Sequence, residues 1–215
     1  MSRHLLITGA SRGIGAAVVE AGLQGGFVVS ACARTAGPGI AAVDVTDAGA
    51  VATWMASAVA RHGPIDLFIN NAAILGPRVP IEVYPEADFR AVLETNVIGA
   101  FLVAKAAVPL LRRPGAVMLH VSSWVGRHGL PRYGAYSVSK FAIEGLARVL
   151  AEELRDDGVI SCALDPGMVQ TDMLRASLGT TDVSEYAEPR QVAARTLALA
   201  AAVTLEQSGT TLDCR

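Results

Sequence analysis

Short runs of apolar residues alternate along the chain with alanine-rich stretches whose apolar positions recur at helical spacing. The apolar runs are continuous, which is typical of strands covered on both faces within a parallel sheet. We expect strands in the segments "HLLITG", "FVVSACA", "IAAVDV", "IDLFIN", "GAVMLHVSS", "VISCALDP" and "TTLDC". Helices are predicted from about residue 14 and over 51–61, 88–111, 134–156 and 189–202. This order predicts one α/β domain over residues 1–215, with a doubly wound parallel sheet between helix layers.

One connection between predicted strands is too short for a helix. Only six residues, "TAGPGI", separate Arg34 from Ala41, whereas a parallel crossover normally takes a dozen or more. Six extended residues reach about 20 Å, which is barely enough to return along a short strand. We therefore predict that no helix lies between the second and third strands, and that the sheet is thinly covered there.

Composition and charge narrow the classes of protein that the chain can represent. Of its 215 residues, 52% are hydrophobic and 18% are charged, which is typical of a compact fold. The net charge of -2 without a basic run does not favour nucleic acid or a membrane surface as partner. The three cysteines are far apart, so we expect reduced thiols and no metal site. Without signal-peptide features or a long uncharged apolar run, the expected location is cytoplasmic.

A glycine-rich turn, "TGASRGIG", follows the first predicted strand. Gly9, Gly13 and Gly15 allow a tight turn and a close backbone approach to a pyrophosphate, and the next helix offers unpaired N–H groups to the anion. The spacing GxxxGxG differs from the GxGxxG of many dinucleotide sites. A plain turn is the competing interpretation, but the position between a strand and a helix favours a Rossmann-type nucleotide site.

Two arginines bear on the choice of nucleotide. The second strand ends in Ala33, where many NAD sites carry an acidic residue for the ribose diol. Arg34 follows at once, and Arg12 lies inside the glycine turn. Guanidinium groups bind phosphate through paired donors, so these residues favour NADP over NAD. Taken singly, each arginine could instead be a solvated surface charge.

The segment "YSVSK" places a lysine four residues after a tyrosine, in a chain with sixteen arginines and two lysines. Helical spacing brings Tyr136 and Lys140 to one face, where the ammonium can act on the phenol. A surface pair without chemistry is the alternative. Asn96 is also unusual, because an amide among apolar helix residues needs a specific hydrogen-bond partner. A purely structural amide is the alternative there.

The motifs "TGASRGIG", "NNAA", Asn96, Ser123, "YSVSK" and "DPGMVQT" resemble those of the classical short-chain dehydrogenase/reductase family in order and spacing. Ser123 precedes Tyr136 by 13 positions, as the family's serine does. The resemblance covers nearly the whole chain. It implies a single Rossmann-type NAD(P)-binding domain and the catalytic residues Asn96, Ser123, Tyr136 and Lys140.

The resemblance also implies a role for each residue. Tyr136 would exchange a proton with the substrate oxygen, and Lys140 would lower the pKa of that phenol and bind the nicotinamide ribose. Ser123 would hydrogen-bond the substrate oxygen, with Ser122 out of register, and Asn96 would hold a water that links Lys140 to solvent. The implied cofactor-binding residues are Gly9, Ser11, Arg12, Gly13, Ile14, Gly15, Arg34, Asp44, Val45, Asn71, Ala72, Tyr136, Lys140, Pro166, Gly167, Val169 and Thr171.

These features predict an NADP(H)-dependent carbonyl reductase that interconverts a carbonyl and a secondary alcohol on a largely apolar small molecule. The substrate pocket is expected in the loops of about residues 167–190, with Trp124 as a further wall. The helices over 88–111 and 134–156 resemble the family's dimerisation surface and imply a homodimer or homotetramer. The short second crossover motivates a second hypothesis, an NADP(H)-binding sensor or regulatory protein with little activity.

Overall fold

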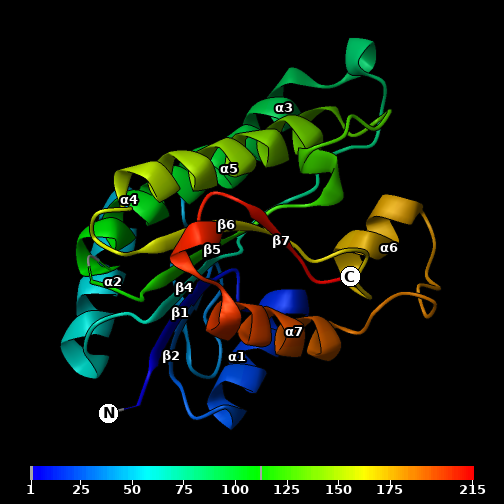
Figure 1. Cartoon of the computed structure of the whole chain (residues 1–215). Helices are drawn as coiled ribbons and strands as arrows, with labels where there is room; N and C mark the ends of the chain where they lie inside the picture. The colour runs from blue at the N-terminus through cyan, green and yellow to red at the C-terminus, as the bar shows by residue number, and fades with distance from the viewer. Residues whose placement is uncertain (1, 112) are drawn as a thin grey trace.

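The computed structural model describes residues 2–111 and 113–215, which form one parallel sheet flanked by helices (Figure 1). The strand order across the sheet is β3-β2-β1-β4-β5-β6-β7. The doubly wound fold predicted from the apolar runs is therefore confirmed. The strands are β1 (His4–Thr8), β2 (Val28–Ala33), β3 (Ile40–Ala42), β4 (Leu67–Asn70), β5 (Val117–Val121), β6 (Ile160–Asp165) and β7 (Thr211–Asp213).

Two helix layers cover the sheet (Figure 1). Helices α1 (Gly13–Gln24) and α7 (Pro189–Ala202) pack together on one face. Helices α2 (Ala48–His62), α4 (Ala100–Leu111) and α5 (Gly134–Glu153) cover the other face. The predicted helices correspond to these elements, within a few residues at each end.

Alternate residues of each strand enter opposite layers of the core. In β1, Leu5 and Ile7 join the hydrophobic cluster beside α1 and α7, while Leu6 joins the cluster beside α2 and α4. Because both faces of the sheet are covered, all five residues of β1 are buried. This two-sided burial explains why the sequence shows continuous apolar runs in its strands.

The crossover between β2 and β3 has no helix, as predicted. Within the described residues 34–40, Gly37 and Ile40 exchange backbone hydrogen bonds of 3.1 and 2.9 Å and form a tight turn. Val28 and Val29 of β2 and Ile40 of β3 are only partly buried. The sheet is therefore thinly covered at this edge.

The helix predicted over 88–111 runs from Glu86 to Leu111 in three parts: α3 (Glu86–Leu93), a π-helical turn η2 (Glu94–Gly99), and α4. This stretch of 26 residues contains an 18-residue window with a mean hydropathy of 1.6, so by length and composition it is long and apolar enough to cross a membrane. Its buried side chains nevertheless pack beside the sheet, as in the core helix of a globular domain: Val103, Ala104, Ala107 and Leu111.

Candidate active site

A cavity of about 1010 Å³ lies at the carboxyl ends of the strands, where ligands bind in doubly wound folds. It brings together every site residue expected from the sequence except Asp44 and Asn96. The expected residues in its wall are Gly9, Ser11, Arg12, Gly13, Ile14, Gly15, Arg34, Val45, Asn71, Ala72, Ser123, Tyr136, Lys140, Pro166, Gly167, Val169 and Thr171.

The glycine turn after β1 has a backbone that strongly favours glycine. Gly9 and Gly13 have positive φ angles of 69° and 58°. A Cβ on Gly15 would lie 2.3 Å from the carbonyl oxygen of Gly9. The amide of Asn71 fastens the turn to β4, because its Nδ2 donates to the carbonyl oxygens of Thr8 and Gly9 at 3.0 and 3.1 Å. The turn is therefore held rigidly against the cavity.

Helix α1 begins at this turn without a side-chain cap. Arg12 precedes the helix and makes no capping hydrogen bond, whereas Asp47 before α2 accepts hydrogen bonds from the N–H groups of Gly49 and Ala50. The first N–H groups of α1 thus remain available to a ligand, and the helix dipole adds partial positive charge there. This arrangement suits a phosphate or pyrophosphate group.

Two exposed arginines, Arg12 and Arg34, stand in the wall near the glycine turn. Arg12 pairs with Asp172 at 3.7 Å, but both side chains are mostly exposed, so the pair contributes little and is easily exchanged for another anion. Ala33, at the end of β2, brings no carboxylate into the cavity. This part of the wall is therefore suited to an anionic group.

Asp44 does not line the cavity. It is exposed, and its Oδ1 accepts hydrogen bonds from the N–H and hydroxyl of Thr46 at 2.9 and 2.8 Å. These hydrogen bonds, with a smaller effect from Arg34, lower the pKa of Asp44. A contact between Asp44 and adenine stays a prediction, while its neighbour Val45 does lie in the wall.

Tyr136 and Lys140 lie one turn apart on α5, and both face the cavity. The Lys140 Nζ donates to the carbonyl oxygen of Val121 at 2.7 Å and lies 5.5 Å from the centre of the Tyr136 ring. Burial lowers the pKa of Lys140 to about 8, against an opposing effect from the charge of Glu144. The ammonium is therefore anchored at the end of β5, beside the tyrosine ring.

The pKa of Tyr136 differs from the expectation. Burial raises it, and the negative charge of Asp165 and the neighbouring Tyr133 raise it further. In the chain by itself the Lys140 ammonium donates to the Val121 carbonyl and not to the phenol, so a lowering of the Tyr136 pKa by Lys140 stays a prediction. Tyr136 is accordingly protonated at neutral pH, as a proton donor must be.

Two serines follow β5, and their surroundings differ. Ser123 lines the cavity and is partly exposed, and its hydroxyl makes no hydrogen bond among the described residues. Ser122 also belongs to the cavity wall, but it is buried, and a Cβ placed on Gly126 would lie 2.6 Å from its Oγ. The geometry thus makes Ser123 the serine that is accessible to a substrate oxygen.

The side chain of Asn96, within the π-helical turn, is fully engaged with protein groups. Its Oδ1 accepts from the N–H of Ile74 at 2.8 Å, and its Nδ2 donates to the Ile74 carbonyl at 2.9 Å and to the Ser139 Oγ at 3.0 Å. The Ser139 hydroxyl donates in turn to the carbonyl of Tyr136 at 2.7 Å. The Asn96 amide therefore has the specific hydrogen-bond partners that were expected for an amide among apolar helix residues. A water that links Asn96 to Lys140 stays a prediction.

The patterns in the sequence do not predict a buried charge cluster beside the site. Arg127 donates to Glu144 at 3.0 Å and to Asp165 at 2.6 Å, and both carboxylates are buried. Glu144 lies one turn after Lys140, and Asp165 ends β6 and accepts from the N–H of Gly167 at 3.0 Å. The cluster ties the helix of Lys140 to the loop at the cavity wall. An acidic residue at the end of an otherwise apolar strand is the signal that points to it.

Part of the wall is apolar, and much of it comes from the loops predicted to form the substrate pocket. Trp124, which stacks on His128 with ring centres 4.2 Å apart, belongs to it. Helix α6 (Asp172–Leu178), which the sequence patterns do not predict, contributes two further side chains. Its larger apolar side chains include Leu75, Trp124, Leu130, Met168, Met173 and Leu174.

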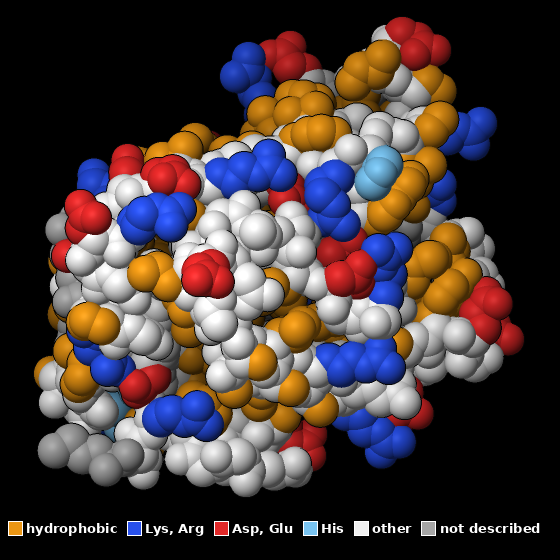
Figure 2. Space-filling view, viewed as in Figure 1, with side chains coloured by type: hydrophobic (Ala, Val, Ile, Leu, Met, Phe, Trp, Pro, Cys, Tyr) orange, Lys and Arg blue, Asp and Glu red, His pale blue; other side chains and the backbone are white. Residues whose placement is uncertain are grey.

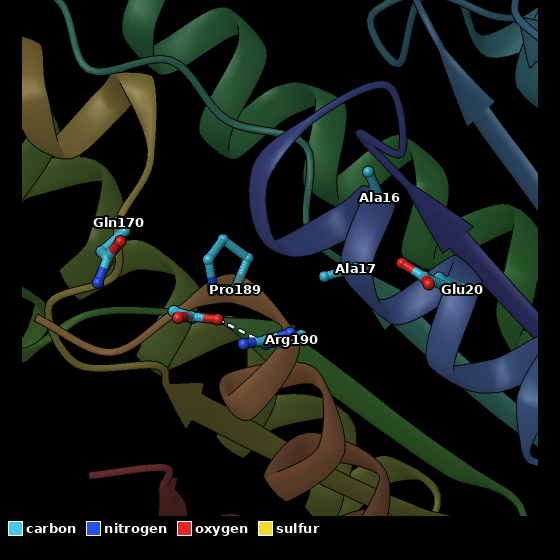
Figure 3. A pocket seen from close by; sticks show the side chains of 7 residues that line it. Ala16, Ala17, Glu20, Gln170, Pro189 and Arg190 are labelled. Atoms are coloured by element: carbon cyan, nitrogen blue, oxygen red, sulfur yellow. Dashed lines mark ion pairs between the residues drawn. The ribbon is translucent and has the colours of Figure 1, made fainter. Parts of the chain in front are cut away.

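A second, smaller hollow of about 460 Å³ lies between the start of α7 and α1 (Figure 3). Its wall includes Ala16 and Ala17, and its charged side chains include the ion pair of Arg190 with Glu188 at 2.5 Å. That pair is largely exposed and carries little energy. The larger cavity is therefore the candidate active site.

An uncapped glycine turn at the carboxyl edge of a doubly wound parallel sheet defines a dinucleotide-binding α/β domain. The family described as short chain dehydrogenase matches residues 3–181 of the chain. The chain belongs to the short-chain dehydrogenase family, and the resemblance read from its motifs is confirmed.

Known relatives and solved structures agree with this membership. The oxidoreductase BOA17 of Botryotinia fuckeliana is 35% identical over 199 residues, covering 86% of this chain and 72% of the relative. An NADPH-dependent pterin aldehyde reductase of Arabidopsis thaliana is 32% identical over 203 residues, covering 87% and 83%. An oxidoreductase structure from E. coli matches with a TM-score of 0.90 at 25% identity, covering 99% of this chain and 95% of that one. A short chain dehydrogenase of Shigella flexneri complexed with NADP has a TM-score of 0.88 at 25% identity, covering 99% and 96%.

Proposed function

We propose that the protein is an NADP(H)-dependent oxidoreductase that interconverts a carbonyl and a secondary alcohol on a small, largely apolar molecule. One observation carries this proposal: Ser123, Tyr136 and Lys140 line the same cavity as the uncapped glycine turn. When bound, the nicotinamide supplies or accepts the hydride. The NADPH-dependent pterin aldehyde reductase relative supports NADPH-dependent reduction of a carbonyl group.

The residues of the chain would handle the proton and the developing charge. In reduction, the Tyr136 hydroxyl donates its proton to the carbonyl oxygen, and the Ser123 hydroxyl donates a hydrogen bond to the same atom. The raised pKa of Tyr136 keeps the donor protonated before the reaction. The Lys140 ammonium, 5.5 Å from the ring centre, stabilises the phenolate that remains. A water beside Asn96 would return the proton from solvent.

The cavity also offers suitable groups to each part of the cofactor. The N-terminus of α1 would hold the pyrophosphate, and Lys140 the nicotinamide ribose hydroxyls. Val169 and Thr171, in the loop after β6, would hold the carboxamide and so fix which ring face meets the substrate. Arg12 and Arg34 would hold the ribose 2′-phosphate, since no carboxylate at the end of β2 repels it.

Replacement of Arg34 by alanine tests the proposed preference for NADP(H). We expect the Kd for NADPH to rise about ten- to a hundredfold while that for NADH changes little, because a charge-assisted phosphate contact is lost. Calorimetric titration with both cofactors measures the effect. Arg61→Ala, an exposed arginine at the end of α2, is the matched control. Equal weakening of NADPH and NADH binding would contradict the assignment.

The pH dependence of reduction tests the role of Lys140. Since its pKa is about 8, the ammonium is present below that pH and is lost above it. We therefore expect kcat/KM for carbonyl reduction to fall as the pH rises through about 8. In Lys140→Arg the charge persists, so the descending limb should move to higher pH even if the rate is lower. If the descending limb of the pH profile lies at the same pH in Lys140→Arg as in wild type, Lys140 is not the group that causes it.

We also propose a homodimer or homotetramer. Hydrophobic side chains gather along the upper edge of the molecule, over α5 and the projecting segment that contains the short helix η1 (Ile81–Val83) (Figure 2). Contiguous apolar surface of this kind marks interaction sites. A monomer in analytical ultracentrifugation at assay concentration would contradict this proposal. The exposed hydrophobic residues of η2, α4 and α5 are Ile98, Phe101, Val138, Phe141 and Val149.

A cytoplasmic location is a further proposal. Its support is that the three cysteines are buried free thiols, which a reducing compartment would preserve: Cys32, Cys162 and Cys214. Fractionation of cells that produce the protein tests this. Recovery outside the cytoplasmic fraction would contradict it.

A panel of aldehydes, ketones and quinones, with NADPH or NADH consumption as readout, tests the proposed activity. Consumption of NADPH with at least one carbonyl compound supports the oxidoreductase. Tight NADPH binding without turnover across the panel would instead favour the alternative, a sensor or regulatory protein. The presence of Tyr136 beside Lys140 supports the enzyme, because a sensor needs no proton donor.

A further inference from the structure

Three residues from separate segments meet over the cavity, and we call them the latch: Arg78, Tyr133 and Ser177. The Tyr133 hydroxyl and the Ser177 Oγ lie 2.5 Å apart, and the Arg78 guanidinium carbon lies 4.6 Å from the centre of the Tyr133 ring. Arg78 also donates to the Ser177 carbonyl oxygen. Tyr133 and Ser177 are 9% and 7% exposed, and both line the cavity. The latch therefore closes part of the cavity wall.

The contacts of the latch give hydrogen-bond partners to groups at the C-terminal end of α6 and to the hydroxyl of Tyr133. Ser177 lies in the last turn of this helix, where carbonyl groups lack helical partners, and Gly179 ends the helix with a φ of 68°. Arg78 donates to one of these carbonyls and brings positive charge to the negative end of the helix dipole. The buried hydroxyl of Tyr133 needs a partner, and Ser177 provides it. Opening α6 would leave these groups without protein partners.

The latch joins α6 to the helix that carries the proposed proton donor. Tyr133 directly precedes α5, and its carbonyl accepts from the N–H of Ser137 at 2.7 Å. Tyr136 lies three residues after the latch tyrosine, in the first turn of α5. On the other side, α6 carries Met173, whose side chain lines the cavity. The latch thus fixes the distance between the apolar wall and the reacting group.

We propose that Tyr133 and Ser177 determine substrate size: by holding α6 in place, they limit the length of the carbonyl compound that reaches Tyr136. This inference rests on the proposed function and refines it. The favoured substrates are compact apolar ketones that fit beneath α6. Both residues act through the position of α6 and not through the proton transfer itself.

Reduction of methyl ketones of increasing chain length tests the proposal in wild type, Tyr133→Phe and Ser177→Ala. We expect wild-type kcat/KM to fall beyond a limiting length, and each variant to gain about five- to tenfold on longer ketones relative to short ones. The double variant should gain no more than either single variant, because both remove one hydrogen bond. Tyr84→Phe and Ser57→Ala are matched controls outside the cavity wall and outside residues 167–190, and they should keep the wild-type length dependence.

Amide hydrogen exchange of residues 172–179 gives a second readout that needs no turnover. We expect faster exchange there in Tyr133→Phe and Ser177→Ala than in wild type or the controls. If wild type reduces short ketones and both variants keep its length dependence, the inference is overturned while the proposed function stands. If wild type reduces neither these ketones nor any carbonyl of the wider panel, the proposed function fails. The rate of amide exchange then tests the latch. Faster exchange of residues 172–179 in the two variants supports it, and an unchanged rate overturns it.

Discussion

Replacing Tyr136 by phenylalanine is expected to lower kcat for carbonyl reduction by about 10²–10⁴-fold, the usual contribution of a positioned general acid. The variant keeps the ring beside Lys140 and removes only the hydroxyl, which makes no hydrogen bond among the described residues. NADPH affinity and the free energy of unfolding should therefore stay close to wild type. Stopped-flow reduction, NADPH titration and urea unfolding measure the three quantities.

Tyr84→Phe is the matched control for this prediction. The Tyr84 hydroxyl is buried without a hydrogen-bond partner among the described residues and lies outside the cavity wall. Its removal should leave kcat unchanged and cost no stability. Wild-type turnover in Tyr136→Phe, with NADPH still bound, would show that another group supplies the proton.

Replacing Arg127 by methionine is expected to lower the free energy of unfolding at neutral pH by about 3–5 kcal/mol. The change leaves the carboxylates of Glu144 and Asp165, which are 3% and 0% exposed, without the guanidinium that joins them. Urea unfolding measures the loss.

Arg148→Met provides the control for the buried cluster. Arg148 also pairs with Glu144, at 3.7 Å, but its side chain is 60% exposed. Its loss should cost less than about 1 kcal/mol. Equal losses in Arg127→Met and Arg148→Met would mean that the cluster contributes no more than a surface pair. Because Glu144 lies one turn after Lys140, Arg127→Met should also reduce activity.

The sheet and the nucleotide end of the cavity could be predicted because their signals are local. Two-sided burial makes strands such as His4–Thr8 continuously apolar, and the backbone of the glycine turn excludes a side chain at Gly15. The short crossover after β2 followed from chain length alone, since six residues cannot form a helix and also return along the sheet. These constraints act within a few residues of sequence.

The remaining features depend on contacts between distant segments. Arg127, Glu144 and Asp165 lie on three different elements, and only the fold brings their charges together. Helix α6 has seven residues, too few to show an apolar period, and its position depends on contacts with Arg78 and Tyr133. The raised pKa of Tyr136 likewise reflects enclosure by surrounding elements and the charge of Asp165, which spacing along one helix does not reveal.

Transfer of deuterium from NADPH that carries deuterium at both hydrogen positions of the nicotinamide C4 tests the central claim most directly. The purified protein is incubated with labelled cofactor and the carbonyl panel, and the alcohol products are examined by mass spectrometry. We predict one deuterium on the carbinol carbon of a product formed by wild type, and its near-complete loss in Tyr136→Phe. Alcohol products without deuterium, or an absence of alcohol despite bound NADPH, would contradict hydride transfer in this cavity.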